Sequence, residues 1–265
     1  MIVTGPTIIN VSGGRTSALM LRRVLDAHGG RLPDEAHAVF CNTGKELPET
    51  LDFLARIERE WNCPIVWLEF VSRRAEARYA VVSHATASRQ GEPFDRLIAS
   101  KRALPNQVMR WCTEELKLKL TIQWARDRGW TEWTSLVGLR ADEPARVARL
   151  RARDHGDFSV ALPLADSRTT KADVVAWWAT QPFDLPLRNW ESNCDACLLK
   201  GRDAVERIER DRPGTLDWWS AHEERLRATF RSDRSYASVR AAARLPLLPL
   251  ALDPEDPALP CACTD

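Results

Sequence analysis

The chain has 265 residues and nearly balanced charge, with 38 Lys and Arg residues against 37 Asp and Glu residues. That balance gives no global electrostatic reason for a polyanionic partner, although it allows a local basic patch. No apolar run approaches the roughly 20 residues that a membrane-spanning helix needs, and the N-terminus lacks a basic, then apolar, then small-residue leader pattern. We therefore expect one main domain in a cytoplasmic protein without a membrane partner.

Strand-like and helix-like segments alternate through the first half of the chain. The apolar pattern predicts strands over residues 7–12, 37–42, 64–70 and 132–139, and helices over 15–28, 47–61 and 113–128, the last capped by Thr113. Such alternation predicts an α/β fold, a Rossmann-like, mostly parallel sheet with helices on both faces. Ligands of such sheets bind beyond the carboxyl ends of the strands.

The pattern changes near residue 154. We expect a core over residues 1–153, its continuation over 154–245, and a flexible tail rich in Pro and Cys over 246–265. The continuation contains one short strand-like piece, a helix entered through Ser167 or Thr169, a segment with a Cys-x-x-Cys motif, and a helical region near 202–230.

A Ser-Gly-Gly loop joins the first predicted strand to the first predicted helix. Gly13 and Gly14 permit positive φ and close backbone approach, and the following helix offers free N–H groups at its positive end. The hydroxyls of Ser12, Thr16 and Ser17 add neutral donors. The loop therefore predicts a phosphate or sulfate site, although it lacks the spacing of a Walker-type loop.

Four motifs in order carry a family resemblance. The stretch SGGRTS resembles the SGGxDS pyrophosphate loop of the adenine nucleotide alpha hydrolase-like superfamily, and CNTGKELPETLDFL resembles the DTGxxxPET segment of phosphoadenosine phosphosulfate (PAPS) reductases. RWCTEELKLKL looks like the Cys-bearing segment of that family, and GLRADE is similar to its GxRxxE segment. The resemblance covers roughly residues 7–200 and implies that an adenine nucleotide is the substrate bound.

The resemblance and the loop together assign the nucleotide or phosphate site. Its predicted residues are Ser12, Gly13, Gly14, Arg15, Thr16, Ser17, Asn42, Thr43, Gly44, Lys45, Glu49 and Arg140, with Pro48, Thr50, Gly138 and Glu143 as further motif matches. Two residues depart from the family pattern, because Thr16 and Asn42 stand where it has Asp. Magnesium remains a candidate cofactor, but the loss of both carboxylates weakens a site that would hold it through them.

The seven cysteines suit free thiols or metal ligands better than a disulfide framework. The resemblance implies a 4Fe-4S cluster on Cys112, Cys194 and Cys197, with zinc as the alternative metal. The family pattern Cys-Cys is Trp111-Cys112 here, so a fourth ligand is missing from its usual place. Either the fourth iron is open, as in thiolation enzymes, or a tail cysteine fills it.

The tail cysteines, Cys261 and Cys263, have three interpretations. One of them is a cluster ligand, or one is a nucleophile like the C-terminal Cys of PAPS reductases, or both are incidental thiols. The usual ECGxH tail of that family is absent, which counts against ordinary sulfate assimilation.

Several cations lie near these motifs. The resemblance gives Arg140 a phosphate or sulfate contact, and Arg15, Lys45 and Lys200 are candidates for balancing phosphate or cluster charge. Four arginines follow at helical spacing as either a solvated face or a path for a polyanion, namely Arg146, Arg149, Arg151 and Arg153.

Three functions fit these features. The main hypothesis is a PAPS reductase-family enzyme that performs sulfur chemistry on an adenylyl sulfate. The first alternative is ATP-dependent thiolation of DNA, tRNA or a metabolite, and the second is a nucleotide-binding module without turnover. The enzyme hypotheses imply a sulfur or electron donor protein as partner; nucleic acid is a candidate partner as well.

Overall fold

The computed structural model describes residues 1–188, 190–191 and 194–245. The strands are β1 (Thr7–Asn10), β2 (Ala36–Asn42), β3 (Ile65–Phe70), β4 (Tyr79–Val82), β5 (Trp133–Leu136) and β6 (Phe158–Ala161). The helices of the first half are α1 (Arg15–Ala27), α2 (Pro48–Glu60), the 3₁₀ turn η1 (Ala75–Ala77), α3 (Glu92–Lys101), α4 (Trp111–Thr113), the π-helical turn η2 (Glu114–Leu118) and α5 (Lys119–Asp127). Those of the second half are α6 (Pro144–Arg151), α7 (Pro163–Asp166), α8 (Lys171–Trp178), α9 (Arg202–Asp211), α10 (Asp217–Leu226) and α11 (Tyr236–Ala243).

The six strands form one sheet in the order β4-β3-β2-β1-β5-β6. All neighbouring pairs are parallel except β3 and β4, which are antiparallel. The chain moves outward from β1 through β2 to β3 and later returns to the other side of β1 with β5. The strand order therefore reverses between β1 and β5, and a crevice at the carboxyl ends of these strands is where such sheets bind ligands.

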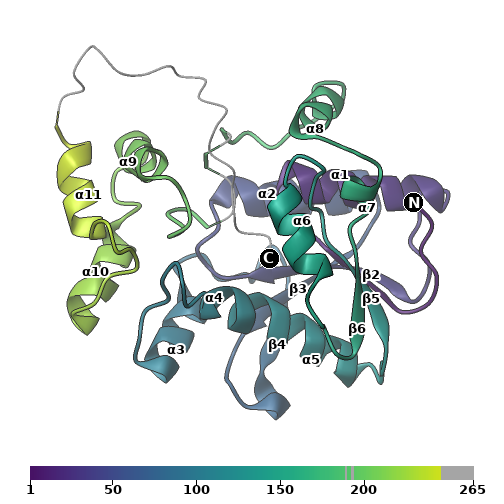
Figure 1. Ribbon diagram of the computed structural model, residues 1–265, viewed down its shortest axis with the longest axis horizontal. Coiled ribbons are helices and arrows are strands. Elements are labelled where there is room, and N and C mark those ends of the chain that lie inside the picture. The colour runs from purple at the N-terminus through teal and green to yellow at the C-terminus, as the bar shows by residue number, and fades with distance from the viewer. Residues whose placement is uncertain (189, 192–193, 246–265) are drawn as a thin grey trace.

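Helices cover both faces of the sheet (Figure 1). Side chains of successive strand residues point to opposite faces. Ile9, Phe40 and Trp67 accordingly join one buried cluster with α1, α2 and α8. Ile8 and Val39 join a second cluster with α3, α5 and α10. The predicted α/β, Rossmann-like fold with a mostly parallel sheet is confirmed.

The helix caps differ from those expected from sequence. Thr113 lies inside a continuous helical stretch that begins with α4, and no side chain caps that start. Helix α8 begins after Thr170 rather than Ser167 or Thr169. Thr170 and Asp173 form a reciprocal capping box there, in which each side chain accepts a hydrogen bond from the other residue's backbone N–H. Both cap assignments from sequence were wrong: the first helical stretch begins earlier, after Arg110, and at the second site Thr170 caps the helix in place of the neighbouring hydroxyl residues.

A group of helices near the C-terminal end packs beside the sheet. Helices α9, α10 and α11 lie together at one side of the molecule (Figure 1). Trp219 and Tyr236 are buried between them and the second core cluster. The Tyr236 hydroxyl donates to the carbonyl of Ala196 at 2.6 Å, which ties this group to the Cys-x-x-Cys segment. Among the described residues, no helix has the length and apolar character that crossing a membrane requires.

Candidate functional site

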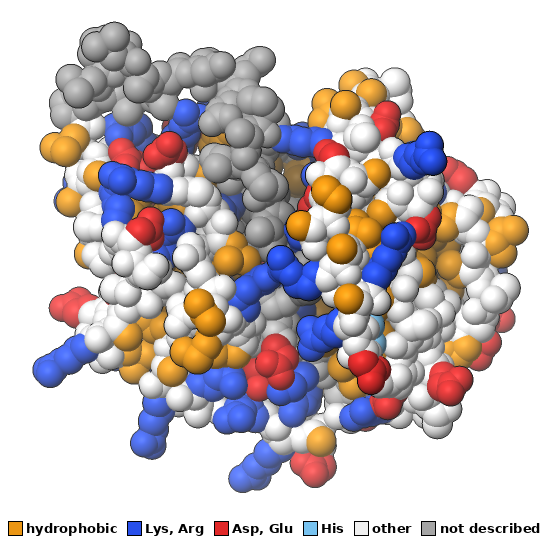
Figure 2. Space-filling view, viewed as in Figure 1, with side chains coloured by type: hydrophobic (Ala, Val, Ile, Leu, Met, Phe, Trp, Pro, Cys, Tyr) orange, Lys and Arg blue, Asp and Glu red, His pale blue; other side chains and the backbone are white. Residues whose placement is uncertain are grey.

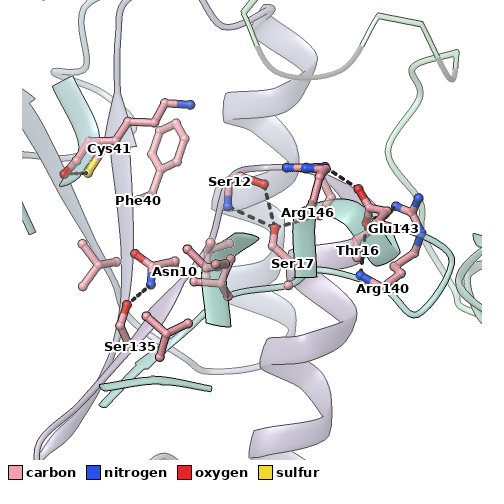
Figure 3. Close-up of a pocket in the computed structure, with 18 of the residues that line it drawn as sticks. Asn10, Ser12, Thr16, Ser17, Phe40, Cys41, Ser135, Arg140, Glu143 and Arg146 are labelled. Carbon is pink, nitrogen blue, oxygen red and sulfur yellow. Dashed lines mark hydrogen bonds and ion pairs between the residues drawn. The ribbon is translucent and has the colours of Figure 1, made fainter. Parts of the chain in front are cut away.

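A cavity of about 390 Å³ opens at the carboxyl ends of β1, β2 and β5, where the strand order reverses. We call it the loop cavity, because Ser12, Gly14 and Thr16 of the Ser-Gly-Gly loop form part of its wall. Its size falls within the range of small-molecule sites. Figure 3 shows Thr16, Arg140, Glu143 and Arg146 together at one side and Asn10, Phe40, Cys41 and Ser135 at the other.

The two loop glycines have different structural duties. Gly13 has φ +80°, and a Cβ there would stand 2.4 Å from Cγ2 of Thr50, so this glycine lets the loop lie against α2. Gly14 has φ −99° and ψ 161°, an extended conformation that any residue adopts. A Cβ on Gly14 would meet only Oγ of Ser12, at 3.8 Å. The missing side chain of Gly14 therefore leaves space in the cavity beside the loop, whereas that of Gly13 allows the loop to pack against α2.

Ser17 holds the loop in shape from within. Its hydroxyl donates to the carbonyl of Gly14 at 3.1 Å and accepts a hydrogen bond from the backbone N–H of Ser12 at 3.0 Å. Ser17 is buried, and its hydroxyl lies 3.1 Å from that of Ser12 (Figure 3). The amides that follow Gly14 are thus fixed at the start of α1, where a helix presents free N–H groups to an anion.

The charged residues that line the loop cavity are mostly cationic. Its described cationic residues are Arg15, Lys117, Arg140, Arg146, Arg153, Lys171 and Arg188, and its described acidic residues are Asp142 and Glu143. Figure 2 shows Lys and Arg side chains gathered around a hollow near the centre of this face. An excess of positive charge in a partly enclosed site concentrates anions such as a polyphosphate chain.

Arg140 is held beside the loop by the acidic pair. Its Nε donates to Asp142 at 2.8 Å, and its Nη1 lies 3.3 Å from the carboxylate of Glu143 and 3.5 Å from the hydroxyl of Thr16. Glu143 also pairs with Arg146. Because both described carboxylates of the lining are engaged with arginines, the guanidinium of Arg140 is fixed where it faces the loop.

Gly138 lets the segment that carries Arg140 lie close to the start of α1. A Cβ at this position would lie 3.2 Å from the Cα of Ser17, so the segment after β5 packs closely against the start of α1. The predicted match of Gly138 to the GxRxxE motif therefore coincides with a structural need for glycine.

Arg15 lines the loop cavity but is engaged with the chain beyond α8. Its guanidinium pairs with Asp184 at 2.7 Å and donates to the carbonyl of Leu187 at 3.1 Å. The backbone carbonyl of Arg15 accepts a hydrogen bond from Nε1 of Trp178 at 2.9 Å. Arg15 thus fastens residues 184–187 beside the loop, and its predicted role toward phosphate stays a prediction.

Asn42 and Gly44 lie outside the described lining of the loop cavity. The Asn42 amide donates to the carboxylate of Glu69 at 2.6 Å and to the carbonyl of Ser88 at 2.8 Å, and its side chain is fully buried. Gly44 has φ +76° and packs against the backbone of Gly91. The structure therefore gives this part of the NTG motif a role in joining loops, and its contact with a nucleotide stays a prediction.

Lys45 and Glu49 also point to other partners. The ammonium of Lys45 is buried, lies 2.9 Å from Asp195, and sits over the ring of Trp218. Glu49 pairs with Arg212 at 2.7 Å. Neither residue belongs to the described lining of the loop cavity. These contacts fasten the NTG segment to the C-terminal helices and to the Cys-x-x-Cys segment.

A second, smaller cavity of about 30 Å³ lies where these segments meet. We call it the cysteine cavity, because Cys112, Cys194 and Cys197 all line it. Its other described walls are Thr43, Phe94, Arg110, Thr113, Leu116, Lys117, Leu198, Leu199 and Trp219. The thiol of Cys112 is thus brought to the two thiols of the Cys-x-x-Cys segment, which lies 82 residues further along the chain.

A short antiparallel bridge between Glu46 and Cys194 aligns the two sides of this cavity. The Thr43 hydroxyl lies 3.5 Å from Sγ of Cys194 and donates to the carboxylate of Glu46 at 2.9 Å. Burial raises the pKa of Glu46, although the nearby Lys117 charge and the Thr43 hydrogen bonds oppose that rise. Thr43 lines the cysteine cavity, and its predicted contact with a nucleotide stays a prediction.

The donor set of the cysteine cavity suits a thiolate-binding metal, because its described walls offer three sulfurs and no carboxylate. Within the described residues, no three His, Cys, Asp or Glu side chains stand in an arrangement that would hold an ion as they are. Burial raises the pKa of the Cys112 thiol, and the positive charges of Lys117 and Arg110 oppose that rise. The site thus has the expected ligands, and loading it requires the thiols to lose protons and draw together.

The remaining predicted residues are Lys200 and the two tail cysteines. The buried ammonium of Lys200 donates to the carbonyl of Trp190 at 2.8 Å and lies outside the described linings of both cavities. Cys261 and Cys263 lie outside the described residues. Their three interpretations stay predictions.

Sequence reasoning missed Lys117, which lines both cavities, and Cys41, which lines the loop cavity. Sγ of Cys41 donates to the backbone carbonyl of Lys117 at 3.6 Å, so the two residues stand together. Burial raises the pKa of the Cys41 thiol to about 12. The sequence shows that Lys117 follows Cys112 by five residues. On a regular helix this spacing would not put the two side chains on one face, so the π-helical turn has to be known before the spacing indicates a shared site.

No model of a known protein family matches the chain. A relative described as an uncharacterized nin region protein, ORF290 of Escherichia phage lambda, is 28% identical over 214 residues, which are 78% of this chain and 70% of the relative. A solved structure, the U34-tRNA thiolase NcsA from Methanococcus maripaludis with its 4Fe-4S cluster, is similar with a TM-score of 0.34 at 13% identity, over 89% of this chain and 80% of that one. At this level of similarity, no substrate or cofactor is carried from that enzyme to this chain.

Proposed function

We propose that this protein is an ATP-dependent sulfurtransferase. The observation that carries the proposal is that a cavity beside the Ser-Gly-Gly loop, rich in cationic residues, shares the lining residue Lys117 with a cavity of three thiols. The loop cavity would hold the phosphates of ATP near Gly14, Thr16 and Arg140. The apolar lining, which includes Phe40, gives an aromatic base a place to pack.

The proposed chemistry has two balanced steps. An oxygen of the acceptor attacks the α-phosphorus of ATP, and pyrophosphate leaves. Sulfide from a donor then attacks the acceptor carbon or phosphorus that carries the adenylated oxygen, and AMP leaves with that oxygen. The residues of this chain contribute by binding the phosphates and by neutralising the charge of both leaving groups.

The cysteine cavity would place the sulfur source beside the activated acceptor. Cys112, Cys194 and Cys197 would hold a metal centre, either an iron-sulfur cluster or zinc, and such a centre would supply a binding site for sulfide. With the three described thiols as ligands, one coordination position would be left for that sulfide if no tail cysteine fills it, and such an opening favours thiolation over reduction of an adenylyl sulfate. The main hypothesis from the sequence, a PAPS reductase-family activity, therefore becomes the second candidate.

The cations of the loop cavity favour an acceptor that is itself anionic. Arg146 of α6 and Arg153, which follows this helix, belong to the same positive lining. A nucleic acid presents phosphates to such a surface, and its binding weakens with added salt. We therefore propose DNA or tRNA as the acceptor class.

The discriminating experiment compares two reactions on protein purified without oxygen. With ATP, sulfide and nucleic acid, the proposal expects AMP and pyrophosphate together with sulfur in the nucleic acid, detected by mass spectrometry of digested nucleosides. With adenylyl sulfate and a dithiol, a reductase would instead release sulfite and AMP. Sulfite release without ATP consumption would replace the proposal with the second candidate. Nucleotide binding without either product would favour the non-catalytic module.

A further inference from the structure

Lys117 stands in the wall between the loop cavity and the cysteine cavity. It is half-buried and belongs to the described lining of both. Its backbone carbonyl accepts the hydrogen bond from Cys41 at the floor of the loop cavity. A lysine at such a boundary can bring its ammonium close to a negative group in either cavity, because its long aliphatic stem needs little movement to reach both.

The π-helical turn η2 explains why Lys117 reaches the cysteine cavity. On a regular α-helix, residues three and four apart share a face, and residues five apart do not. A π-helical turn pairs residues five apart, and such turns occur frequently at functional sites. The turn spans Glu114–Leu118, directly after Cys112 and containing Lys117. It therefore brings the ammonium to the side of the helix that carries the thiol.

The electrostatics agree with this placement. The positive charge of Lys117 opposes the burial that raises the pKa of Cys41 in the loop cavity. Lys117 also lines the cysteine cavity, so one side chain stands at the boundary of both cavities.

We propose that Lys117 is the positioning residue that binds the phosphate chain of the nucleotide from the side of the cysteines. It thereby directs the reacting phosphates toward the wall that separates them from the three thiols. This inference rests on the proposed function only in taking the loop cavity as the site of ATP. It adds that the phosphate chain runs toward η2 as well as toward the Ser-Gly-Gly loop.

A matched control is available two residues along the same helix. Lys119 carries the same charge, but it pairs with Glu114 at 2.7 Å and with Glu115 at 3.1 Å. It belongs to the described lining of neither cavity. A long-range field effect would be similar for both lysines, whereas a direct phosphate contact belongs to Lys117 alone.

The first test measures the affinities of ATP and adenosine for the wild type, Lys117→Met and Lys119→Met by calorimetry. Loss of one charge-assisted hydrogen bond predicts that Lys117→Met weakens ATP by about 10- to 100-fold. Adenosine should bind equally to all three proteins, and Lys117→Arg should recover part of the ATP affinity. Equal weakening of ATP by the two methionine variants, or equal loss of adenosine by Lys117→Met, would overturn the inference.

The second test maps the direction of the phosphate chain. An ATP analogue with a photoreactive group on its terminal phosphate should crosslink to peptides containing residues 111–119 or 194–199, and Lys117→Met should reduce that crosslinking. Crosslinks confined to other peptides would overturn the inference. A wild type that binds neither ATP nor the analogue would refute the proposed function, whereas ATP binding unaffected by Lys117→Met would refute only the role of Lys117.

Discussion

The loop cavity and the cysteine cavity are assembled in different ways. The loop cavity is the larger one and carries several cations, and its defining stretch is the six consecutive residues 12–17, which run from the loop after β1 into the first turn of α1. The cysteine cavity is small and mostly apolar, and it needs three segments separated by many residues, around Thr43, Cys112 and Cys194. A site of the first kind is encoded locally, whereas a site of the second kind exists only when the whole chain is folded.

A mutation in one cavity should therefore change the binding at that cavity and leave the binding at the other nearly unchanged. Cys197→Ala should abolish retention of iron or zinc, because a three-thiol site cannot lose one ligand and keep its metal. ATP affinity should stay within about twofold of the wild type. Metal content by elemental analysis, after purification without oxygen, checks the first expectation. Cys63→Ala is the control, since Cys63 is buried in the other core cluster. Full metal content in Cys197→Ala would remove that residue from the site.

The reciprocal variant acts at the loop cavity. Gly14→Val should weaken ATP by about 100-fold, or roughly 2.7 kcal/mol, because its side chain fills the space beside the loop amides. The extended backbone of Gly14 accepts valine, so thermal stability should be retained. Gly13→Ala should instead lower stability, because its Cβ would meet Thr50. Unchanged ATP affinity in Gly14→Val would contradict the anion-loop assignment.

The C-terminal helices, which are tied to the Cys-x-x-Cys segment, should contribute a pH-dependent part of the free energy of unfolding. Glu223 is buried and accepts hydrogen bonds from the backbone N–H groups of Phe230 and Tyr236, and burial raises its pKa above the usual 4.5. A raised pKa in the folded state gives a stability contribution that is fully present below pH 4.5 and is lost as the pH rises through the folded-state pKa.

Glu223→Gln should remove that pH dependence and cost about 1–3 kcal/mol at low pH, because its amide leaves one backbone donor unsatisfied. Urea unfolding at several pH values from 4 to 8 measures both effects. The exposed neighbour on the same helix provides the control, Glu224→Gln. A variant whose stability follows the wild-type pH profile would show that Glu223 does not titrate as described.

The smallest effect is expected at the wall of the loop cavity formed by α8. Thr170→Ala removes one half of the capping box and should lower the unfolding free energy by about 1 kcal/mol. Because Lys171 and Val174 follow on the same helix and line the cavity, ATP affinity should fall only slightly. A serine hydroxyl keeps the cap, so Thr170→Ser should retain the stability of the wild type. A loss in Thr170→Ser equal to that of Thr170→Ala would rule out the capping hydroxyl as the cause.

Much of the fold was predictable because its signals are local. Buried apolar runs placed β1, β2 and β3 within a few residues, and amphipathic spacing placed α1 and α2. The structure adds β4, α3 and α7, which the sequence analysis did not predict. Helix α6 was anticipated only through the spacing of its arginines, of which Arg146 lines the loop cavity.

The residues of the candidate site likewise fall into a group whose placement the motifs predicted and a group whose contacts they did not. Ser12, Gly14, Thr16 and Arg140 meet at one cavity, as the motifs predict. Asn42, Lys45 and Glu49 also lie in a motif segment, but their side chains contact other protein groups. A motif identifies which residues stand together in sequence, and it does not determine the direction in which each side chain points once neighbouring segments pack against it.

The sequence by itself determined the alternation of strands and helices, the Ser-Gly-Gly loop after β1, and the identity of three thiols suited to a metal. Those features depend on residue type and short spacing, which act before the chain folds. Only the tertiary structure decided that Thr43 faces the cysteines, that η2 turns Lys117 toward them, and that the two cavities share a wall. These depend on packing between distant segments, where burial and hydrogen bonding select one arrangement.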